Sequence, residues 1–254
     1  MISLGGKAAL VTGGSRGIGA ATVKLFAAAG ADVVFNFHRN REAANQVEAE
    51  ARRHGTRIES LKADLARTAE AKKLVSYAVR RLGRLDILVV NAGIWNAEDA
   101  PIEALGERDW DEMIRVNLKS AYTVTHFAAP QMIAQKSGRI IVLSSTAGQR
   151  GEAFHSHYAA SKGAVISFVK SLATELARYG VLVNCVAPGW VETDMSRPLL
   201  ATKAGAKVAT SAIPLGRVGR PEEIAGPILF LASDLATFVT GEVLNVNGGA
   251  VLCG

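Results

Sequence analysis

The chain has 254 residues, of which 49% are hydrophobic and 20% are charged, and its formal net charge is +6. This composition is typical of a soluble globular protein with a sizeable core. It excludes a membrane-spanning chain, because no segment reaches the roughly 18 apolar residues that cross a bilayer. The presence of only two cysteines excludes a disulfide framework.

Short apolar runs alternate with helical patterns along the whole chain. Seven runs rich in Val, Ile and Leu predict parallel strands buried on both faces, near Lys7–Val11, Asp32–Phe37, Arg57–Leu61, Asp86–Val90, Arg139–Leu143, Leu182–Ala187 and Val243–Val246. Helices are expected between them, near Ile18–Ala29, Arg41–His54, Ala69–Leu82, Glu107–Gln135, His157–Arg178 and Pro221–Ala232. The alternation predicts an α/β fold: one Rossmann-type doubly wound domain over residues 1–254, with a seven-stranded parallel sheet flanked by helices. The least regular stretch, at about 189–219, is the candidate substrate loop.

The first strand leads directly into a glycine-rich turn, Thr12-Gly13-Gly14-Ser15-Arg16-Gly17-Ile18-Gly19, and then into a helix. The glycines permit a tight turn and close backbone approach, and the start of a helix presents free N–H groups and a positive dipole end to a pyrophosphate. The strand–turn–helix context predicts a dinucleotide-binding loop, although the spacing differs from the common G-x-G-x-x-G.

The end of the second strand bears on the choice of cofactor. Dinucleotide folds that prefer NAD place an acidic residue there to hold the ribose 2′-hydroxyl, whereas this chain has Phe37 followed by His38 and Arg39. With Arg16 in the glycine loop, two arginines could contact an adenosine 2′-phosphate. NADP(H) is therefore favoured over NAD(H); the alternative is that Arg39 is a solvated loop charge.

Tyr158 and Lys162 lie four residues apart on a predicted helix, so both side chains should project from one face. An ammonium one turn away is expected to favour the phenolate and to lower the phenol pKa, giving an acid/base group suited to neutral pH. Taken alone, the pair could equally be an exposed helix contact.

Together with Asn91-Ala92-Gly93 and Pro188-Gly189, these motifs occur in the order found in the short-chain dehydrogenase/reductase family, which the chain resembles over essentially its full length. The resemblance implies a catalytic tetrad of Asn117, Ser145, Tyr158 and Lys162. Ser145 is preferred to Ser144, because successive strand residues face opposite ways. The resemblance and the loop together imply a cofactor site of Gly13, Ser15, Arg16, Gly17, Ile18, Gly19, His38, Arg39, Asp64, Leu65, Asn91, Ala92, Gly93, Tyr158, Lys162, Pro188, Gly189 and Thr193.

In the reductive direction, the resemblance implies hydride transfer to a carbonyl carbon while Tyr158 protonates the carbonyl oxygen. Ser145 would polarise that oxygen, Lys162 would hold the charge state of the phenol and the nicotinamide ribose, and Asn117 would anchor a proton-relay water. The alternatives are a serine at a strand end and a helix-kinking Asn117 bonded to backbone. No metal is expected, because no Cys or His cluster has zinc-like spacing.

The chain most resembles the 3-oxoacyl-[acyl-carrier-protein] reductases of this family, which implies NADPH-dependent reduction of a 3-oxoacyl thioester in fatty acid biosynthesis. The segment 148–157 is more polar and bulkier than expected for an acyl channel. Trp95, Phe154, His155 and Trp190 are candidate substrate-pocket residues, with packing or subunit contact as the alternative. A second hypothesis is a short-chain dehydrogenase for an alcohol, sugar, polyol or steroid, and a third, of another class, is a non-catalytic NADP(H)-sensing protein.

The expected partners follow from the same resemblance. Lys136 matches one basic docking position for an acyl carrier protein, whereas Tyr179 stands at the second, which weakens that assignment. Family members assemble as homotetramers, and the apolar segment 250–254 fits burial against a neighbour. Neither a membrane nor nucleic acid is expected as a partner, because the basic residues are scattered and lack interleaved aromatics. The segment from Met1 to Lys7 lacks a signal-peptide pattern, so a cytoplasmic location is expected.

Overall fold

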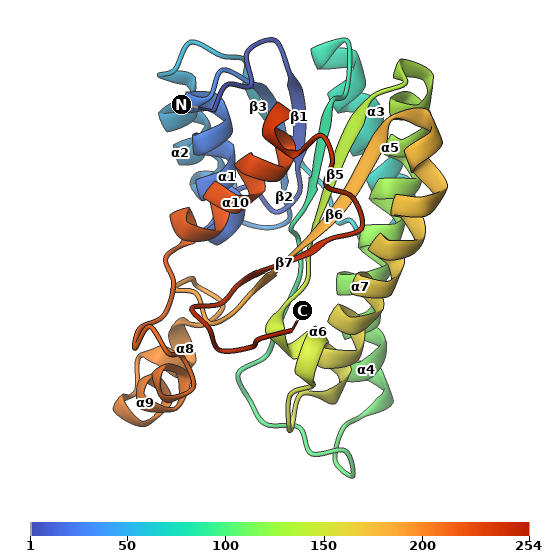
Figure 1. Ribbon diagram of the computed structural model, residues 1–254. Coiled ribbons are helices and arrows are strands. Elements are labelled where there is room, and N and C mark those ends of the chain that lie inside the picture. Colours follow the sequence, from blue (N-terminus) through green and yellow to red (C-terminus); the bar gives the residue numbers. More distant parts are fainter. Residues whose placement is uncertain (1, 254) are drawn as a thin grey trace.

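A computed structural model describes residues 2–253. Its centre is a sheet of seven strands in the order β3-β2-β1-β4-β5-β6-β7, and every neighbouring pair is parallel (Figure 1). The strands are β1 (Ala8–Val11), β2 (Asp32–Phe37), β3 (Ile58–Lys62), β4 (Ile87–Val90), β5 (Gly138–Leu143), β6 (Val181–Pro188) and β7 (Val243–Val246). The predicted seven-stranded, doubly wound parallel sheet is therefore confirmed, and every predicted strand limit agrees with the structure to within one residue.

Helices cover both faces of the sheet (Figure 1). They are α1 (Gly17–Ala28), α2 (Arg41–Arg52), α3 (Thr68–Leu82), α4 (Glu107–Ile114), α5 (Ser120–Gln135), α6 (Thr146–Arg150), α7 (Ser156–Leu176), α8 (Arg197–Leu200), α9 (Lys203–Ser211) and α10 (Pro221–Ala232). Three further short helical segments are η1 (Arg115–Lys119), η2 (Ala177–Tyr179) and η3 (Asp234–Ala236).

Two apolar cores lie on opposite sides of the sheet. Val11 packs with α1, α2 and α10 on one side, whereas its neighbour Leu10 packs with α3, α5 and α7 on the other. Both side chains are fully buried. Because adjacent strand residues face opposite ways, a strand buried on both faces is apolar throughout rather than alternating. The same arrangement places the carboxyl ends of the strands along one edge, where ligands bind in folds of this kind.

The predicted helix over Glu107–Gln135 is interrupted. Residues Arg115–Lys119 form a π-helical segment between α4 and α5, with Asn117 buried at its centre. Such segments occur often at functional sites, because the widened turn redirects a side chain. The hydrophobic pattern does not encode this change of pitch.

The stretch 189–219 is more regular than expected. It contains α8 and α9, and the Thr202 hydroxyl caps α9 by accepting a hydrogen bond from Gly205 N at 3.0 Å. A parallel bridge joins Val191 to Gly219 at its base. The expectation of an irregular stretch was therefore wrong. Helices as short as α8, which is a single turn, leave too little periodicity in the sequence to be predicted.

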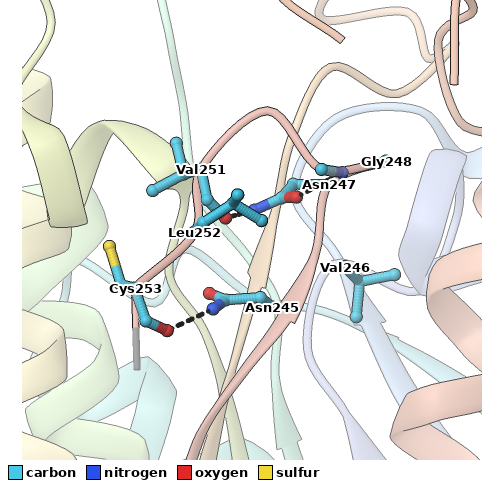
Figure 2. Close-up of a pocket in the computed structure, with 8 residues that line it drawn as sticks. Asn245, Val246, Asn247, Gly248, Val251, Leu252 and Cys253 are labelled. Atoms are coloured by element: carbon cyan, nitrogen blue, oxygen red, sulfur yellow. Dashed lines mark hydrogen bonds between the residues drawn. The ribbon is translucent and has the colours of Figure 1, made fainter. Parts of the chain in front are cut away.

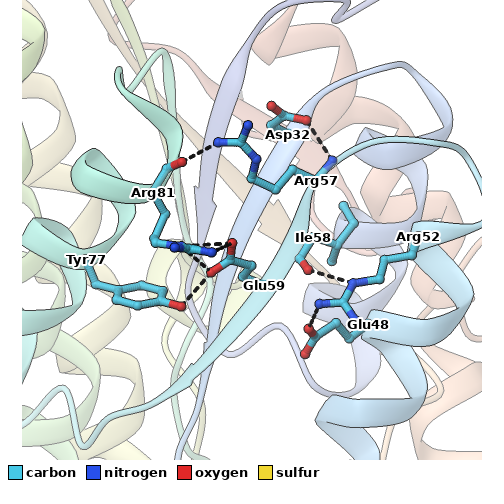
Figure 3. A network of polar contacts seen from close by, with 8 residues as sticks. All are labelled: Asp32, Glu48, Arg52, Arg57, Ile58, Glu59, Tyr77 and Arg81. Atoms are coloured by element: carbon cyan, nitrogen blue, oxygen red, sulfur yellow. Dashed lines mark hydrogen bonds and ion pairs between the residues drawn. The ribbon is translucent and has the colours of Figure 1, made fainter.

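The edge strand β3 is covered by charged contacts (Figure 3). Glu59 accepts hydrogen bonds from Tyr77 at 2.5 Å and from Arg81 Nη2 at 2.6 Å, and the Arg81 guanidinium lowers the pKa of this carboxyl. Arg52 pairs with Glu48 nearby. These ion pairs place Arg52 and Arg81 at the solvated surface and shield the otherwise open edge of β3. Among residues 2–253, no helix combines the length and apolarity needed to cross a membrane.

Candidate active site

A cavity of about 670 Å³ opens at the carboxyl edge of the sheet. It lies where the strand order changes direction, since β1 is flanked by β2 on one side and by β4 on the other. Crevices at such switch points bind nucleotides in open α/β sheets. The cavity extends from the glycine loop and the end of β2, past the ends of β4 and β5, to the segment after β6.

The glycine loop forms one wall. Gly13 and Gly17 have φ values of 65° and 53°, in the left-handed region that favours glycine. Both line the cavity together with Ser15, Arg16 and Ile18. Gly19 does not line it. A Cβ at Gly19 would lie 2.2 Å from the Gly13 carbonyl oxygen, so this glycine permits close packing of α1 beneath the loop.

Hydrogen bonds fix the adjoining strand ends. The Thr12 hydroxyl accepts hydrogen bonds from Asn91 N at 2.9 Å and from Ala92 N at 3.0 Å, while Asn91 Nδ2 donates to Thr12 O at 3.0 Å. These contacts join β1 to β4. Asn91 therefore braces the sheet, and Asn91, Ala92 and Gly93 all line the cavity.

Asn36, on β2, is a residue that the sequence reasoning missed. Its Oδ1 accepts a hydrogen bond from Gly13 N at 2.8 Å, and its Nδ2 donates to Ala63 O at 3.0 Å. It is buried and bridges the glycine loop to the segment after β3. A lone asparagine in an apolar strand was the available signal, because a buried amide needs partners on both its atoms.

The opposite end of this wall carries the residues expected near the adenosine. His38, Arg39, Asp64 and Leu65 all line the cavity, as does Arg16 of the glycine loop. Phe37 is buried, with Arg41 placed 4.5 Å from its ring centroid. No carboxylate therefore occupies the end of β2, and that part of the cavity is lined by two arginines, Arg16 and Arg39, together with the acidic Asp64.

Ser145, Tyr158 and Lys162 converge on the cavity from two elements. Ser145 directly precedes α6 and caps it by accepting a hydrogen bond from Ala147 N at 3.1 Å. Tyr158 and Lys162 lie one turn apart on α7. The neighbouring Ser144 instead donates to Lys162 O at 2.7 Å and is buried, so its hydroxyl is occupied by the α7 backbone.

Lys162 was expected to lower the pKa of the Tyr158 phenol, and this expectation was wrong. Burial raises the pKa of Tyr158 to about 12, although a hydrogen bond with Ser145 opposes this shift. Burial lowers the pKa of Lys162 to about 8. Lys162 Nζ donates to Leu143 O at 2.9 Å and lies 5.9 Å from the Tyr158 ring centroid. The helical spacing thus brings the two side chains together, but the ammonium is directed to the end of β5.

Asn117 lies behind this group and does not itself line the cavity. Its Oδ1 accepts a hydrogen bond from Ile94 N at 2.8 Å, and its Nδ2 donates to Ile94 O at 3.0 Å. Gly93 leaves room in front of it, since a Cβ there would lie 3.1 Å from Asn117 Oδ1 and 3.5 Å from Lys162 Nζ. The amide is therefore bonded to backbone and still lies close to the ammonium.

The four candidate substrate residues divide into two pairs. Trp95 and Trp190 line the cavity with ring centroids 5.5 Å apart, edge to face. His155 does not line it; the ring is buried and stacks on Trp95 at 5.1 Å. Phe154 was a wrong assignment, because its side chain is exposed and lies outside the lining. Its φ of 63° turns the backbone at this point.

The segment after β6 closes the far side of the cavity. Pro188, Gly189 and Thr193 line it as expected, and Thr193 Cγ2 would lie 3.2 Å from a Cβ at Gly17. Gly189 approaches Asn247, whose Cα would lie 3.0 Å from an added Cβ. Asn247 belongs to a shallow C-terminal hollow, where its Nδ2 donates to Val251 O at 2.9 Å (Figure 2). That hollow lies on the surface formed by residues 245–253.

Comparison with known proteins gives the family. The family described as enoyl-(acyl carrier protein) reductase matches residues 13–251. The chain belongs to the short-chain dehydrogenase/reductase family. Its members are oxidoreductases that work with a nicotinamide cofactor, and the chain is therefore an enzyme of this class. The left-handed glycines, the α1 start and the cationic end of the cavity fit such a dinucleotide.

Individual relatives agree with this assignment. The chain is 41% identical to a 3-oxoacyl-[acyl-carrier-protein] reductase of Thermotoga maritima, covering 98% of this chain and 99% of the relative. It is also 41% identical to a protein of the same name from Synechocystis, covering 99% and 100%. Among solved structures, a putative short-chain alcohol dehydrogenase from Sinorhizobium meliloti superposes with a TM-score of 0.92 at 33% identity, covering 98% and 97%.

Proposed function

We propose that this short-chain dehydrogenase/reductase reduces a ketone to a secondary alcohol with NADPH, and that its substrate is a 3-oxoacyl thioester. The observation that carries the proposal is the convergence of Ser145, Tyr158 and Lys162 on one cavity with the glycine loop. The relatives at about 40% identity named 3-oxoacyl-[acyl-carrier-protein] reductase support the substrate class.

The chemistry follows from what each side chain can do. A bound nicotinamide supplies the hydride. The Tyr158 phenol donates a proton to the developing alkoxide, for which a protonated phenol is required at the start. Ser145 donates a hydrogen bond to the same oxygen and stabilises its charge. The raised pKa of Tyr158 keeps the phenol protonated before substrate binds, which suits the reductive direction.

Lys162 and Asn117 support this transfer. Among the described residues 2–253, Lys162 Nζ donates one hydrogen bond, to Leu143 O, so its remaining protons can meet the ribose of a bound cofactor. An ammonium beside Tyr158 would then stabilise the phenolate that proton transfer leaves behind. Asn117, bonded to the backbone at Ile94, holds the π-helical segment in place next to that ammonium.

NADP(H) is favoured over NAD(H) by the cationic end of the cavity. Arg16, His38 and Arg39 line it, and no carboxylate terminates β2. A guanidinium makes charge-assisted and often bidentate contacts with phosphate. Comparing Michaelis constants for the two cofactors tests this preference. A preference for NADH would refute the role given to these side chains.

The substrate class is tested by following NADPH oxidation with an acetoacetyl thioester and a panel of ketones, and NADP⁺ reduction with alcohols, sugars and polyols. Turnover of the thioester with the highest kcat/KM is the expected result. A higher value for an alcohol, sugar or polyol would support the second candidate, a short-chain alcohol dehydrogenase, which the polar segment 148–157 favours. Tight NADPH binding without any turnover would point to a cofactor-sensing protein.

Docking of an acyl carrier protein and assembly as a homotetramer are parts of the same proposal. Lys136 and Tyr179 precede β5 and β6, at the amino edge of the sheet and opposite the cavity. Arg178 lies 4.7 Å from the Tyr179 ring centroid, so a cation is present at this second position. A carrier protein bound there would have to serve the cavity of another subunit. Sedimentation and binding of an acyl carrier protein test both statements.

A further inference from the structure

Glu152 places a carboxylate in the wall of the catalytic cavity. Its side chain lines the same space as Ser145 and Tyr158. Glu152 is partly buried, and this burial raises the pKa of its carboxyl above the ordinary value. Its charge in turn acts on Tyr158 and raises the pKa of that phenol. The Glu152 carboxyl group is thus close enough to Tyr158 to influence its pKa. Glu152 has no role in the reaction described above.

The Glu152 carboxylate has no side-chain partner among the residues that the structure describes. Over residues 2–253, its oxygens form neither an ion pair nor a side-chain hydrogen bond. Arg150 and His155 lower its pKa through their charge but do not contact it within hydrogen-bonding distance. Glu152 is of intermediate exposure and its oxygens are still reached by solvent. A donor from a bound ligand would therefore replace water at a carboxylate that no side chain of the protein already occupies.

The loop that carries Glu152 is held rigidly. Gly151 and Phe154 have φ values of 77° and 63°, and Phe154 O accepts a hydrogen bond from Ala100 N at 2.9 Å. His155 has its Nδ1 3.2 Å from Ala153 O and its Nε2 2.9 Å from Asn96 O. A non-glycine residue in the left-handed region is retained where its surroundings over-determine it, often beside a functional site. The backbone that carries Glu152 is therefore held in place beside the cavity.

We propose that Glu152 is a specificity-determining residue that accepts a hydrogen bond from a hydroxyl or amide N–H close to the carbonyl being reduced. The inference rests on the proposed ketone reduction. It narrows the substrate class to ketones with a donor group near the reacting carbon, such as a hydroxyketone or a thioester whose thiol arm carries an amide. Trp95 and Trp190 also line the cavity and offer apolar surface to the rest of such a substrate.

The test compares matched substrates that differ by one donor. One pair is the acetoacetyl thioester of N-acetylcysteamine and S-ethyl acetothioacetate, and the other is 4-hydroxy-2-butanone and 2-butanone. The selectivity is the ratio of kcat/KM with and without the donor, measured for the native enzyme, Glu152→Ala and Glu152→Gln. Glu103→Ala is the control, because Glu103 is exposed and lies outside the cavity lining.

In the native enzyme and the control, at least one pair should show about tenfold or greater preference for the donor-bearing member, as expected for a hydrogen bond to a charged group. Glu152→Ala should bring that ratio close to one, and Glu152→Gln should retain part of it, because an amide oxygen still accepts. The pair that responds tells whether the donor is an amide or a hydroxyl. Equal rates within both pairs, or a ratio unchanged in Glu152→Ala, would overturn the proposal.

A binding measurement separates this proposal from the proposed function. If none of the four compounds is reduced, ketone reduction of this class fails, while calorimetric binding to the NADP⁺ complex still reports on Glu152. Donor-bearing compounds should then bind about tenfold more tightly than their partners, and Glu152→Ala should remove the difference. No difference in affinity for the native protein would reject the role of Glu152 irrespective of catalysis.

Discussion

Replacing Lys162 with methionine should make the cofactor-free protein more stable at neutral pH while abolishing turnover. Lys162 is 6% exposed, and burial lowers its pKa from 10.5 to about 8. At about 1.4 kcal/mol per pKa unit, burying the charged ammonium lowers the free energy of unfolding by about 3 kcal/mol at pH 7. Methionine removes that cost but leaves Leu143 O without its donor, which costs about 1 kcal/mol. The expected gain is about 2 kcal/mol.

The gain depends on pH with a definite sign. Because the folded pKa lies below the unfolded one, the unfolded chain binds more protons between pH 8 and 10.5, and the native protein becomes more stable as pH rises through that window. At pH 10 the remaining cost falls below about 1 kcal/mol, so Lys162→Met and the native protein should unfold at similar temperatures.

Thermal unfolding of the cofactor-free proteins at pH 7 and pH 10 measures this effect. An increase of about 4–8 °C is expected for Lys162→Met at pH 7, since 1 kcal/mol moves the midpoint of a chain of this size by about 2–4 °C. Lys170→Met is the matched control, because Lys170 is exposed on the same helix. A lower midpoint than the native protein at pH 7, or a gain equal at both pH values, would refute the assignment of a costly buried charge.

Three further predictions address the remaining parts of the site. Tyr158→Phe should leave NADPH affinity within a few-fold of native while lowering kcat by about 10²–10⁴-fold, as for loss of a general acid, and near-native turnover would contradict that role. Arg39→Ala should raise the KM for NADPH by about tenfold or more and leave that for NADH nearly unchanged, because only NADPH carries the 2′-phosphate; equal effects on both cofactors would argue for a structural role. Gly19→Ala should destabilise the protein by about 1–3 kcal/mol and weaken cofactor binding, since its Cβ would lie 2.2 Å from Gly13 O; unfolding at the native temperature would show that the loop yields.

Local sequence patterns predicted much of the cofactor half of the cavity. The turn at Thr12–Gly19, the segment Asn91-Ala92-Gly93 and the pair Tyr158 and Lys162 are compact motifs whose parts are close in sequence. The placement of a residue within such a motif depends on a single helix, strand or turn, so the sequence can predict it. The structure accordingly places most of these residues in the lining, apart from Thr12, Gly14 and Gly19, of which Gly19 packs beneath the loop.

The substrate half was harder to read, because it depends on contacts between distant segments. His155 lies behind Trp95 since its ring is held by carbonyls at Ala153 and Asn96, and Phe154 points outward from a backbone in the left-handed region. Neither orientation has a sequence signature. Glu152 was overlooked for the same reason, as one acidic residue in a polar segment carries no indication of which way it faces.

The sequence alone determined the parallel sheet and its ligand edge, because strands buried on both faces must be apolar throughout and glycines must stand where the backbone turns left-handed. Only the tertiary structure decided the electrostatics of the site. Helical spacing put Lys162 on the same face as Tyr158, but burial and the Leu143 carbonyl determined where its charge lies and in which direction both pKa values move. Desolvation depends on everything packed around a group, and that surrounding comes from segments far apart in the chain.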